Sequence, residues 1–481
     1  MTNLSGTNLN SGSAVGPQGE GRDSPSNFPK YPAYKDSGVE WLGDVPESWT
    51  VTLLKRGYEV VLGKMLQPEA KRDDDEFLPY LRAANIQVSG VDISDVKKMW
   101  FGVDEKKSLL LRQGDLLVSE GGDVGRSAIW DLDEECYFQN SINRIRSISG
   151  NDTRFLYFWM ITIKGNGYVD VLCNKSTIAH FTAEKVAAVP LPIPSIHEQT
   201  QIARFLDHET ARIDALIEEQ QRLIELLKEK RQAVISHAVT KGLDPTVPMK
   251  DSGVEWLGEV PAHWQVKRLK HLVPSITVGI VVEPSKYYVD DGVPALRSLN
   301  VKPGAVVTEN LVYLSEESNE LHAKSKIFEG DIVAVRSGQP GTAAIVPKEF
   351  NGANCIDLIV IRKPLQGCST FIFWYLNSDA ALKQFSEGSS GAIQQHFNIA
   401  AASEMIFAWP PANEQLEINS HLDRACHQLD RLISVAGESK SLLLERRSAL
   451  ISAAVTGKID VRGWQPPAST QAPEPAVAEA V

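Results

Sequence analysis

Two stretches of the chain repeat apolar residues at intervals of seven and predict two long helices. The first seam consists of Leu206, Ile213, Gln220, Leu227 and Val234, with Ile217 and Ile224 at the second heptad position. The second seam consists of Leu422, Leu429, Ala436, Leu443 and Leu450, with Ile433 and Lys440. This spacing keeps one apolar stripe along one side of a helix and is typical of coiled coils. From position 206 to position 234 the seam is about 42 Å long, given the rise per residue of an α-helix.

Polar residues, as in EEQQR and KEKRQ, occupy the remaining faces of the first helix. A single helix of this kind is typical of a surface helix on a globular core. Two equivalent helices of equal length favour the alternative, in which the helices pack against each other. We therefore expect an antiparallel coiled coil, with a glycine (Gly242 and Gly457) close to the end of each helix.

The stretch before each helix contains short apolar runs, which indicate strands. GDLLVSE and GDIVAVRS begin with Gly114-Asp115 and Gly330-Asp331, a dipeptide that fits a turn entering a strand. FLYFWMITI and FIFWYLNS predict helices. The segments VPLPIPSIHEQ and WPPANEQ follow, where proline is expected to stop the strand and extend the chain. These patterns predict α+β globular domains.

The chain is internally duplicated. KDSGVEWLGDVPESW at positions 35–49 recurs as KDSGVEWLGEVPAHW at positions 250–264, with three changes. The same offset, 215 or 216 residues, relates LRAAN to LRSLN, His180-Phe181 to His396-Phe397, and Glu198-Gln199 to Glu414-Gln415. One register over both halves indicates a single unit used twice.

The duplication predicts a pseudo-twofold chain of six segments. They are a disordered N-terminal arm (1–28), a globular domain (29–195), a helical spacer (196–245), a second globular domain (246–411), a second helical spacer (412–464) and a disordered Pro/Ala-rich tail (465–481). Two related heads on a spacer suggest the reading of two sites at a fixed separation.

Composition limits the class of protein. The five cysteines are odd in number and form no CxxC pair, which favours reduced thiols in the cytoplasm and gives no support for a zinc site. No apolar run reaches the length of a membrane span, and the N-terminus does not resemble a signal peptide. The net charge of −12 is unusual for a protein that binds nucleic acid.

The partial catalytic motifs in the sequence each lack a required residue. EGGDVGRS is one residue short of a phosphate-binding loop and has Arg126 where lysine is needed, so a turn between strands fits better. Trp409-Pro410-Pro411-Ala412 lacks the amide or acidic residue and the aromatic of amino-methyltransferases. His180 and His396 are expected to be core or boundary residues.

These motifs together resemble the specificity subunit of type I restriction–modification systems. The resemblance rests on the two GVEWLG…VP…W openings, on the two exits PLPIPSIHEQTQIARFLD and WPPANEQLEINSHLD, and on the helix ends ISHAVTKGLD and ISAAVTGKID. It covers the chain from about Lys30 to Trp464.

The resemblance implies two target-recognition domains, each reading one half of a bipartite, asymmetric double-stranded DNA sequence. It implies that the helices fix the spacer and dock two modification subunits, and that two restriction subunits add translocation and cleavage. The chain itself is then a cytoplasmic, non-catalytic subunit without cofactor or metal, since S-adenosylmethionine, ATP and Mg²⁺ belong to the partner subunits. Those partners can supply part of the phosphate contact that an acidic chain lacks.

Residues that read bases are expected to differ between the halves, because each half reads a different sequence. The shared Trp41, Trp49, Trp256, Trp264, Gly114 and Gly330 are therefore expected to be framework. Arg82 and Arg297 are shared too, and fit a phosphate contact or a structural ion pair equally well. The divergent candidates are Ser119, Arg126, Lys175, Ser176 and Thr177 in the first half and Arg336, Ser337, Gln339, Gln394 and Gln395 in the second. Arginine suits guanine and glutamine suits adenine; the alternative for each residue is a solvated loop residue.

Two other functions remain open at this point. A coiled-coil scaffold with two protein-binding heads would explain the acidic charge, but would not require heads that diverge more than the helices. A self-contained nuclease or methyltransferase is disfavoured by the missing motifs.

Overall fold

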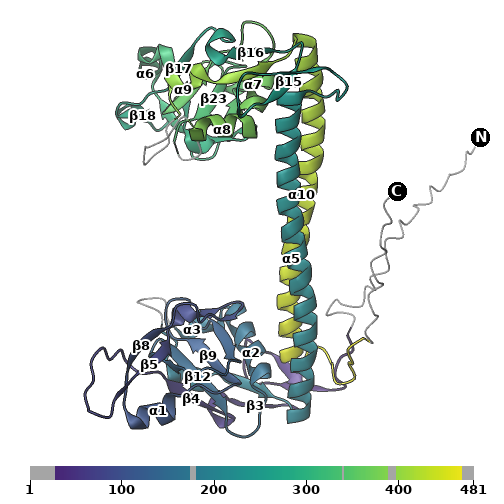
Figure 1. Cartoon of the computed structure of the whole chain (residues 1–481). Helices are drawn as coiled ribbons and strands as arrows, with labels where there is room; N and C mark the ends of the chain where they lie inside the picture. The colour runs from purple at the N-terminus through teal and green to yellow at the C-terminus, as the bar shows by residue number, and fades with distance from the viewer. Residues whose placement is uncertain (1–27, 174–179, 338–340, 388–396, 468–481) are drawn as a thin grey trace, which may run out of the picture. The chain divides into compact units, whose positions relative to one another are not determined.

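The computed structural model describes residues 28–173, 180–337, 341–387 and 397–467. The chain forms two compact units: residues 1–219 with 439–481, and residues 220–438. Almost all of the predicted N-terminal arm and C-terminal tail lies outside the described residues. Figure 1 labels those helices and strands for which it has room.

The first unit is built on an antiparallel four-stranded sheet in the order β10-β9-β12-β4. These strands span Ser127–Trp130, Asp115–Ser119, Ile142–Ser147 and Tyr58–Leu62. A smaller sheet, β11-β5-β8, consists of Tyr137–Phe138, Glu76–Leu81 and Lys97–Phe101. The remaining short strands are β1 (Tyr34–Asp36), β2 (Asp44–Pro46), β3 (Thr50–Leu53), β6 (Ile86–Gln87), β7 (Gly90–Val91) and β13 (Pro190–Ile193).

Short helices cover the sheets of the first unit. They are α1 (Val103–Leu109), α2 (Thr153–Gly165), α3 (Tyr168–Leu172) and α4 (Ala183–Ala187). FLYFWMITI lies within α2, as the sequence predicts, and Asp152 begins this helix by accepting the backbone N–H groups of Arg154 and Phe155. The buried Phe155 and Trp159 of α2 pack into the main core of the unit, with Trp49 and Leu116.

The second unit repeats this plan. Its main sheet has the order β17-β26-β23-β24, formed by Ile276–Val278, Leu358–Ile361, Ile332–Val335 and Ala343–Ile345. Its second sheet, β18-β22-β19-β25, is formed by Tyr288–Val289, Val312–Leu314, Val293–Leu296 and Asn354–Cys355. The remaining strands are β14 (Met249–Asp251), β15 (Glu259–Pro261), β16 (Gln265–Arg268), β20 (Val301–Lys302), β21 (Ala305–Val306) and β27 (Ile406–Trp409). The short helices are α6 (Glu316–Leu321), α7 (Ser369–Leu376), α8 (Asp379–Glu387) and α9 (Ile399–Glu404).

The repeated Gly-Asp dipeptides lie where the sequence predicts a turn entering a strand. Gly114 and Gly330 have φ values of 86° and 85°, a conformation that glycine adopts without strain. The following Asp115 and Asp331 are buried. Asp115 forms two hydrogen bonds of 2.6 Å with Arg146, so the dipeptide anchors the turn as well as forming it.

The first proline-rich exit differs from the prediction that proline stops the strand. Pro190 and Pro192 lie within β13, which pairs with β3 in a two-stranded sheet. Each strand of such a sheet has one unpaired edge, where a residue without an N–H group costs no ladder hydrogen bond. Proline is therefore tolerated here inside the strand.

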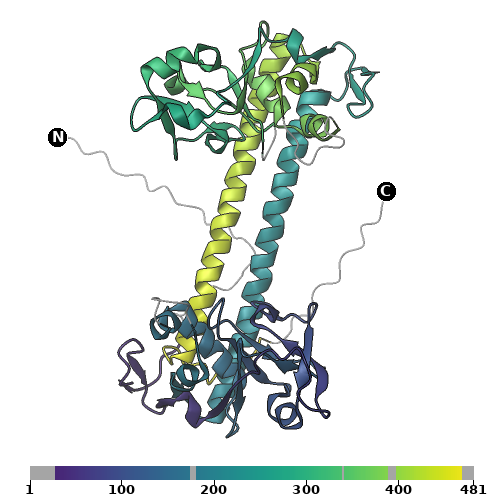
Figure 2. The same ribbon diagram turned by 90° about the vertical axis from the view of Figure 1, so that its left-hand side faces the viewer.

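The two long helices span Ile196–Lys241 (α5) and Ala412–Val455 (α10). In the first unit, Gln201 donates to the carbonyl of Val461, and Asp214 pairs with Arg447 at 2.7 Å. Partner numbers fall along α10 as they rise along α5, so the two segments run antiparallel. Figure 2 shows them side by side in this unit.

The same pairing occurs in the second unit. Arg231 pairs with Asp430 at 2.9 Å, and a side chain added at Gly242 would lie 3.3 Å from Glu414. Asp430 and Arg231 are the duplicates, at an offset of 216, of Asp214 and Arg447. The duplication therefore repeats one ion pair, as expected when two duplicated helices pack antiparallel.

The predicted seam residues lie on the inner side of both helices. Leu206, Ile213, Leu422, Leu429 and Leu450 are buried, and Ile217, Leu227, Val234, Ile433 and Leu443 are half-buried. The α+β fold with an internal duplication and antiparallel long helices agrees with the sequence prediction.

Candidate nucleic-acid interface

Four loops meet at one end of the main sheet of the first unit. The carbonyl of Lys64, after β4, accepts the N–H of Asn140 at 2.9 Å. The next residue, Ser141, accepts the N–H of Glu120 from the loop after β9, also at 2.9 Å. Glu120 in turn accepts the N–H of Phe181, which precedes α4, at 2.9 Å. We call this set of loops the loop end of the unit.

The second unit has the equivalent loop end. Ile280, after β17, accepts the N–H of Asp357 at 3.1 Å. Arg336, after β23, accepts the N–H of Phe397 at 2.9 Å, and its guanidinium pairs with Asp357 at 2.6 Å. The duplication therefore preserves the backbone of this region as well as that of the sheet.

Arg126, at the loop end of the first unit, contacts the residue that follows Arg82. Arg126 donates to the carbonyl of Ala83 at 3.2 Å. Arg82 pairs with Asp95 at 2.8 Å and is about one third exposed. Hydrogen bonds from Lys97 and then Arg82 hold the pKa of Asp95 below its usual value. Both guanidinium groups are thus held in place and remain partly open to solvent.

Ser119 is fully buried, and its hydroxyl donates to the carbonyl of Gly121 at 2.7 Å. It shapes the turn between β9 and β10 and presents no surface to a ligand. A pattern of variable residues in a loop cannot distinguish such an inward-facing position from its exposed neighbours.

In the second unit Arg336 and Ser337 follow β23 directly, and Arg297 follows β19. Arg297 donates to the carbonyl of Asn310 at 2.5 Å. The side chain of Arg336 is about one quarter exposed. It also lines a hollow of about 380 Å³ together with Val281 and Asn398.

The other predicted contacts, Lys175, Ser176, Thr177, Gln339, Gln394 and Gln395, lie outside the described residues, as does His396. Their flanking residues belong to the loop ends, since Phe181, Arg336 and Phe397 take part in the hydrogen bonds given above. His180 has a half-exposed side chain 3.9 Å from Glu120, so it lies at the surface and not in the core.

Two asparagines, not singled out as site residues in the sequence, position the shared arginines. Asn85 accepts the backbone N–H of Arg82 at 2.9 Å and donates to the carbonyl of Asp92 at 2.8 Å. Asn300 accepts the N–H of Arg297 at 3.0 Å in the same way. Both amides are buried. The signal was present in the repeated LRAAN and LRSLN, because the asparagine recurs with the arginine.

The shared tryptophans act as framework, together with the repeated Glu-Gln dipeptide. The indole N–H of Trp49 donates to Glu198 at 3.0 Å, and that of Trp264 donates to Glu414 at 3.0 Å. Each bond joins the opening phrase of a unit, the repeated segment 35–49 or 250–264, to the first turn of a long helix. Trp41 stacks on Trp159 with ring centroids 5.7 Å apart.

Within residues 28–173, 180–337, 341–387 and 397–467 there is no group of three or more His, Cys, Asp or Glu that could hold a metal ion. Over the same ranges, none of the helices is long and apolar enough to cross a bilayer. The loop ends instead offer arginines and hydrogen-bonding groups, which are the side chains that contact phosphates and base edges.

Comparison with known proteins gives a consistent result. Residues 46–227 match the model of the type I restriction modification DNA specificity domain. The chain is 22% identical to the type I restriction enzyme MjaVIII specificity subunit of Methanocaldococcus jannaschii, over 87% of this chain and 94% of that protein. It is 25% identical to the EcoKI specificity subunit of Escherichia coli K12, over 61% and 62% of the two chains.

Solved structures share the fold. A chain from a study of complex assembly and conformational transition of the type I R-M system has a TM-score of 0.66 at 15% identity, covering 85% of this chain and 98% of that one. The HsdS subunit of Thermoanaerobacter tengcongensis has a TM-score of 0.50 at 16% identity, covering 86% and 98%. The chain therefore resembles, over most of its length, the specificity subunits of type I restriction enzymes, and its residues 46–227 match their DNA specificity domain.

Proposed function

We propose that this chain directs a type I restriction–modification complex to a bipartite, asymmetric DNA sequence. Each globular domain (29–195 and 246–411) reads one half-site through its loop end. The observation that carries this proposal is the recurrence of one loop-end backbone in both units with different side chains on it. A reader of two different half-sites needs one rigid framework and two sets of contacts.

Within this proposal Arg126, Arg336, Ser337 and the loop residues 175–177, 339 and 394–395 supply base contacts. Arg82 and Arg297 contact phosphates, since both are shared and each is held by a buried asparagine. Ser119 is assigned no contact, because its side chain is buried.

The long helices set the spacer between the half-sites. Their predicted seam of about 42 Å is comparable with one turn of B-DNA. The equivalent ion pairs, Asp214–Arg447 and Asp430–Arg231, support a single register for the two helices. A fixed register keeps the distance between the two readers constant.

The same helices dock two modification subunits. Six exposed apolar residues each directly precede a seam residue: Leu216, Leu223 and Leu226 on α5, and Leu432, Val435 and Leu442 on α10. An apolar stripe beside an occupied seam is typical of a surface that another protein covers. The modification subunits carry S-adenosylmethionine, and two restriction subunits supply ATP- and Mg²⁺-dependent cleavage.

The acidic net charge of −12 fits a chain that binds DNA only within such a complex. Phosphate neutralisation by lysine and arginine provides most non-specific affinity for DNA. Because acidic residues outnumber lysine and arginine in this chain, 61 to 49, partner subunits provide that part of the affinity, and this chain contributes the base contacts.

Mapping of N6-methyladenine tests the proposal. The chain is co-expressed with the modification subunit encoded beside it in a host that lacks adenine methylation, and methylated sites are mapped across the genome. One split motif, with two short halves around a fixed unspecified spacer, is expected. An unsplit motif would refute the two-reader proposal. Absence of methylation by a soluble, assembled complex would favour the scaffold alternative.

A further inference from the structure

Both units expose two consecutive apolar side chains on the segment that leaves the loop end. Met65 and Leu66 follow β4 and are 74% and 57% exposed. Val281 and Val282 follow β17 and are 46% and 72% exposed. The offset between the pairs is 216, so they occupy the same position of the duplicated unit. We call them the apolar pairs.

A close backbone approach fixes the position of each pair. A side chain added at Gly63 would lie 2.3 Å from the carbonyl oxygen of Gln139, and one added at Gly279 would lie 2.5 Å from that of Cys355. Only glycine fits at either place, because the opposing atom belongs to backbone. The chain therefore leaves the sheet at a defined point, and the apolar pair begins two residues later.

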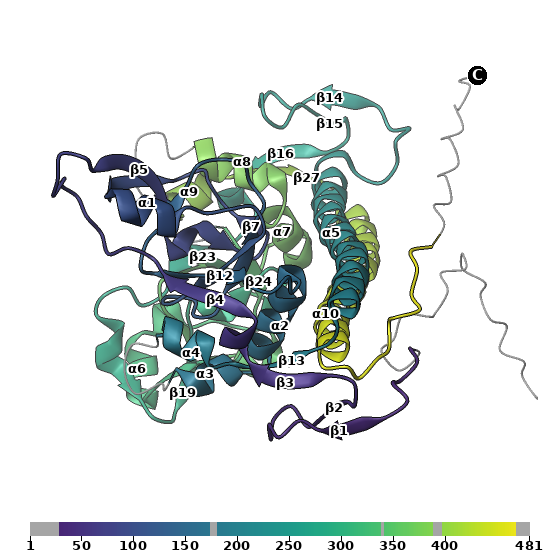
Figure 3. The same cartoon turned by 90° about the horizontal axis from the view of Figure 1, so that it is seen from below.

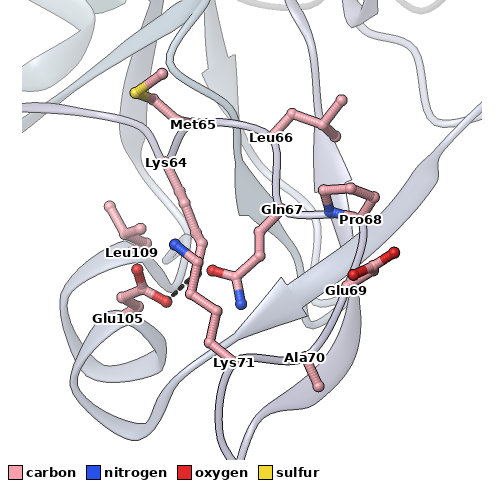
Figure 4. A pocket seen from close by; sticks show the side chains of 10 residues that line it. All are labelled: Lys64, Met65, Leu66, Gln67, Pro68, Glu69, Ala70, Lys71, Glu105 and Leu109. Carbon is pink, nitrogen blue, oxygen red and sulfur yellow. Dashed lines mark hydrogen bonds and ion pairs between the residues drawn. The ribbon is translucent and has the colours of Figure 1, made fainter.

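The residue after the first pair is also anchored. Gln67 is buried. Its side-chain amide donates to Asp75 at 3.1 Å, and its backbone carbonyl accepts the N–H of Trp100 at 3.1 Å. Figure 4 shows Lys64 and Gln67 pointing into a hollow of about 580 Å³, where Lys64 pairs with Glu105. Met65 and Leu66 also line this hollow, and Figure 4 shows their side chains pointing away from those of Lys64 and Gln67. The exposure of the pair thus belongs to an ordered segment.

The second pair adjoins a predicted base-reading residue. Val281 and Arg336 line the same hollow of about 380 Å³. The carbonyl of Ile280, the residue before the pair, accepts the N–H of Asp357, whose carboxylate binds Arg336. A ligand that occupies this hollow therefore lies beside both Arg336 and Val281.

The apolar pairs differ between the two units, as expected of residues that contact bases and not of framework residues. Trp49/Trp264, Gly63/Gly279 and Asn85/Asn300 are identical in the two units, whereas Met-Leu in one unit corresponds to Val-Val in the other. A partner protein that docks twice on equivalent surfaces would favour identical residues. Two different DNA half-sites favour side chains that share a chemical class and differ in shape.

We propose that each apolar pair determines specificity for thymine in the half-site read by its unit. The C5-methyl group of thymine is the apolar group that base pairs present in the major groove, and apolar side chains recognise it by contact. Contact with these methyl groups buries the apolar surface that the folded unit leaves exposed, and this burial favours binding. This inference rests on the proposed function, because it assigns contacts within the same DNA-reading loop ends.

The test uses the complex of the full chain with its modification subunit. Methylation maps are recorded for the unaltered complex, for the double variants M65S/L66S and V281S/V282S, and for the matched exposed controls I148S and L365S. Gel filtration and thermal melting verify assembly and folding. Each double variant is expected to relax an A·T position in one half of the motif only, and the controls are expected to leave the motif unchanged.

A binding measurement then isolates the methyl group. Deoxyuridine replaces thymine, one position at a time, in a duplex carrying the mapped motif. Loss of one buried methyl group is expected to weaken binding of the unaltered complex by about fourfold. The corresponding serine variant should bind both duplexes equally, and the conservative variant M65V/L66V should remain sensitive.

Three results would overturn the inference. They are an unchanged motif in both double variants, an equal loss in both half-sites, and a loss of complex assembly, which would mark the pairs as a protein-docking surface. Failure of the proposed function is recognised separately, because the unaltered complex would then produce no split motif, and both proposals would fall.

Discussion

Replacement of Arg336 by alanine separates a reading role from a structural one. Its ion pair with Asp357, at 2.6 Å, joins side chains that are 27% and 44% exposed. A pair this open to solvent contributes about 0.2–1 kcal/mol to folding. For a unit of this size, the loss lowers the melting temperature by at most about 4 °C.

The expected effect on DNA recognition is larger. A bidentate arginine–guanine contact contributes about 1–3 kcal/mol of discrimination, a factor of about 5–150. R336A should therefore lose discrimination by this factor at one base pair of the half-site read by the second unit. Fluorescence anisotropy of the assembled complex, on duplexes substituted at each position of the motif, measures the effect.

The variant D357N is the matched control. Asp357 has φ of 50°, a conformation that asparagine tolerates well among non-glycine residues. The substitution weakens the ion pair and leaves the guanidinium in place, so discrimination should persist. Equal losses in R336A and D357N would show that the ion pair shapes the loop and that Arg336 reads no base. Equal losses in both half-sites would refute the division of labour between the units.

Three further predictions concern the framework. Glu198→Ala leaves a buried phenol and a buried indole N–H without their acceptor, so the free energy of unfolding of the first unit should fall by about 2–5 kcal/mol in urea titrations. Asp115→Ala leaves Arg146 without its carboxylate and should cost about 3 kcal/mol by the same measurement, whereas no change would mean that the pair is dispensable. Burial raises the pKa of the Cys355 thiol to about 12, above that of an unfolded cysteine, so its contribution to stability is complete below pH of about 8.5 and is lost as the pH rises towards 12. Mass spectrometry after iodoacetamide treatment at pH 8.5 should find the half-buried Cys368 labelled before Cys355.

The long helices and the duplication could be predicted from the sequence because both leave periodic signals. The heptads of α5 and α10 and the offset of 216 depend on many residues, so no single substitution hides them. The β-rich parts carry weaker signals, since their strands are two to six residues long. The prediction that proline ends the strand is wrong at Pro190 and Pro192, because only the fold shows that β13 pairs with β3 alone and keeps one unpaired edge.

The candidate site could be predicted only by region. Variation between the halves indicates the loops after β9 and β23, but not which side chains in them face outward. Ser119 ends β9 and Arg126 ends the loop that follows, yet the first is buried and the second is partly open. The exposed Met65 and Leu66 gave no signal in the sequence, because apolar residues in a loop look like core residues until the fold shows that their side chains remain outside.

Contacts at the helix ends of the first unit fix the orientation of its loop end relative to the long helices. Gly457, at the end of α10, would place a side chain 2.3 Å from Pro46, and Tyr34 of the hairpin β1–β2 donates to its carbonyl at 3.1 Å. Figure 3 shows this hairpin beside the end of α10. Trp49, adjacent to the same hairpin, binds Glu198 at the start of α5.

The opening phrase of the unit is therefore clamped between the last turn of one long helix and the first turn of the other. This explains why the phrase is the most faithfully repeated part of the chain, although it forms no part of the loop ends. A change in the helices would move the clamp and with it the sheet that carries the loops. Substitutions in the loops, by contrast, leave the clamp untouched, so the proposed function allows new DNA sequences to be read without any change in the framework.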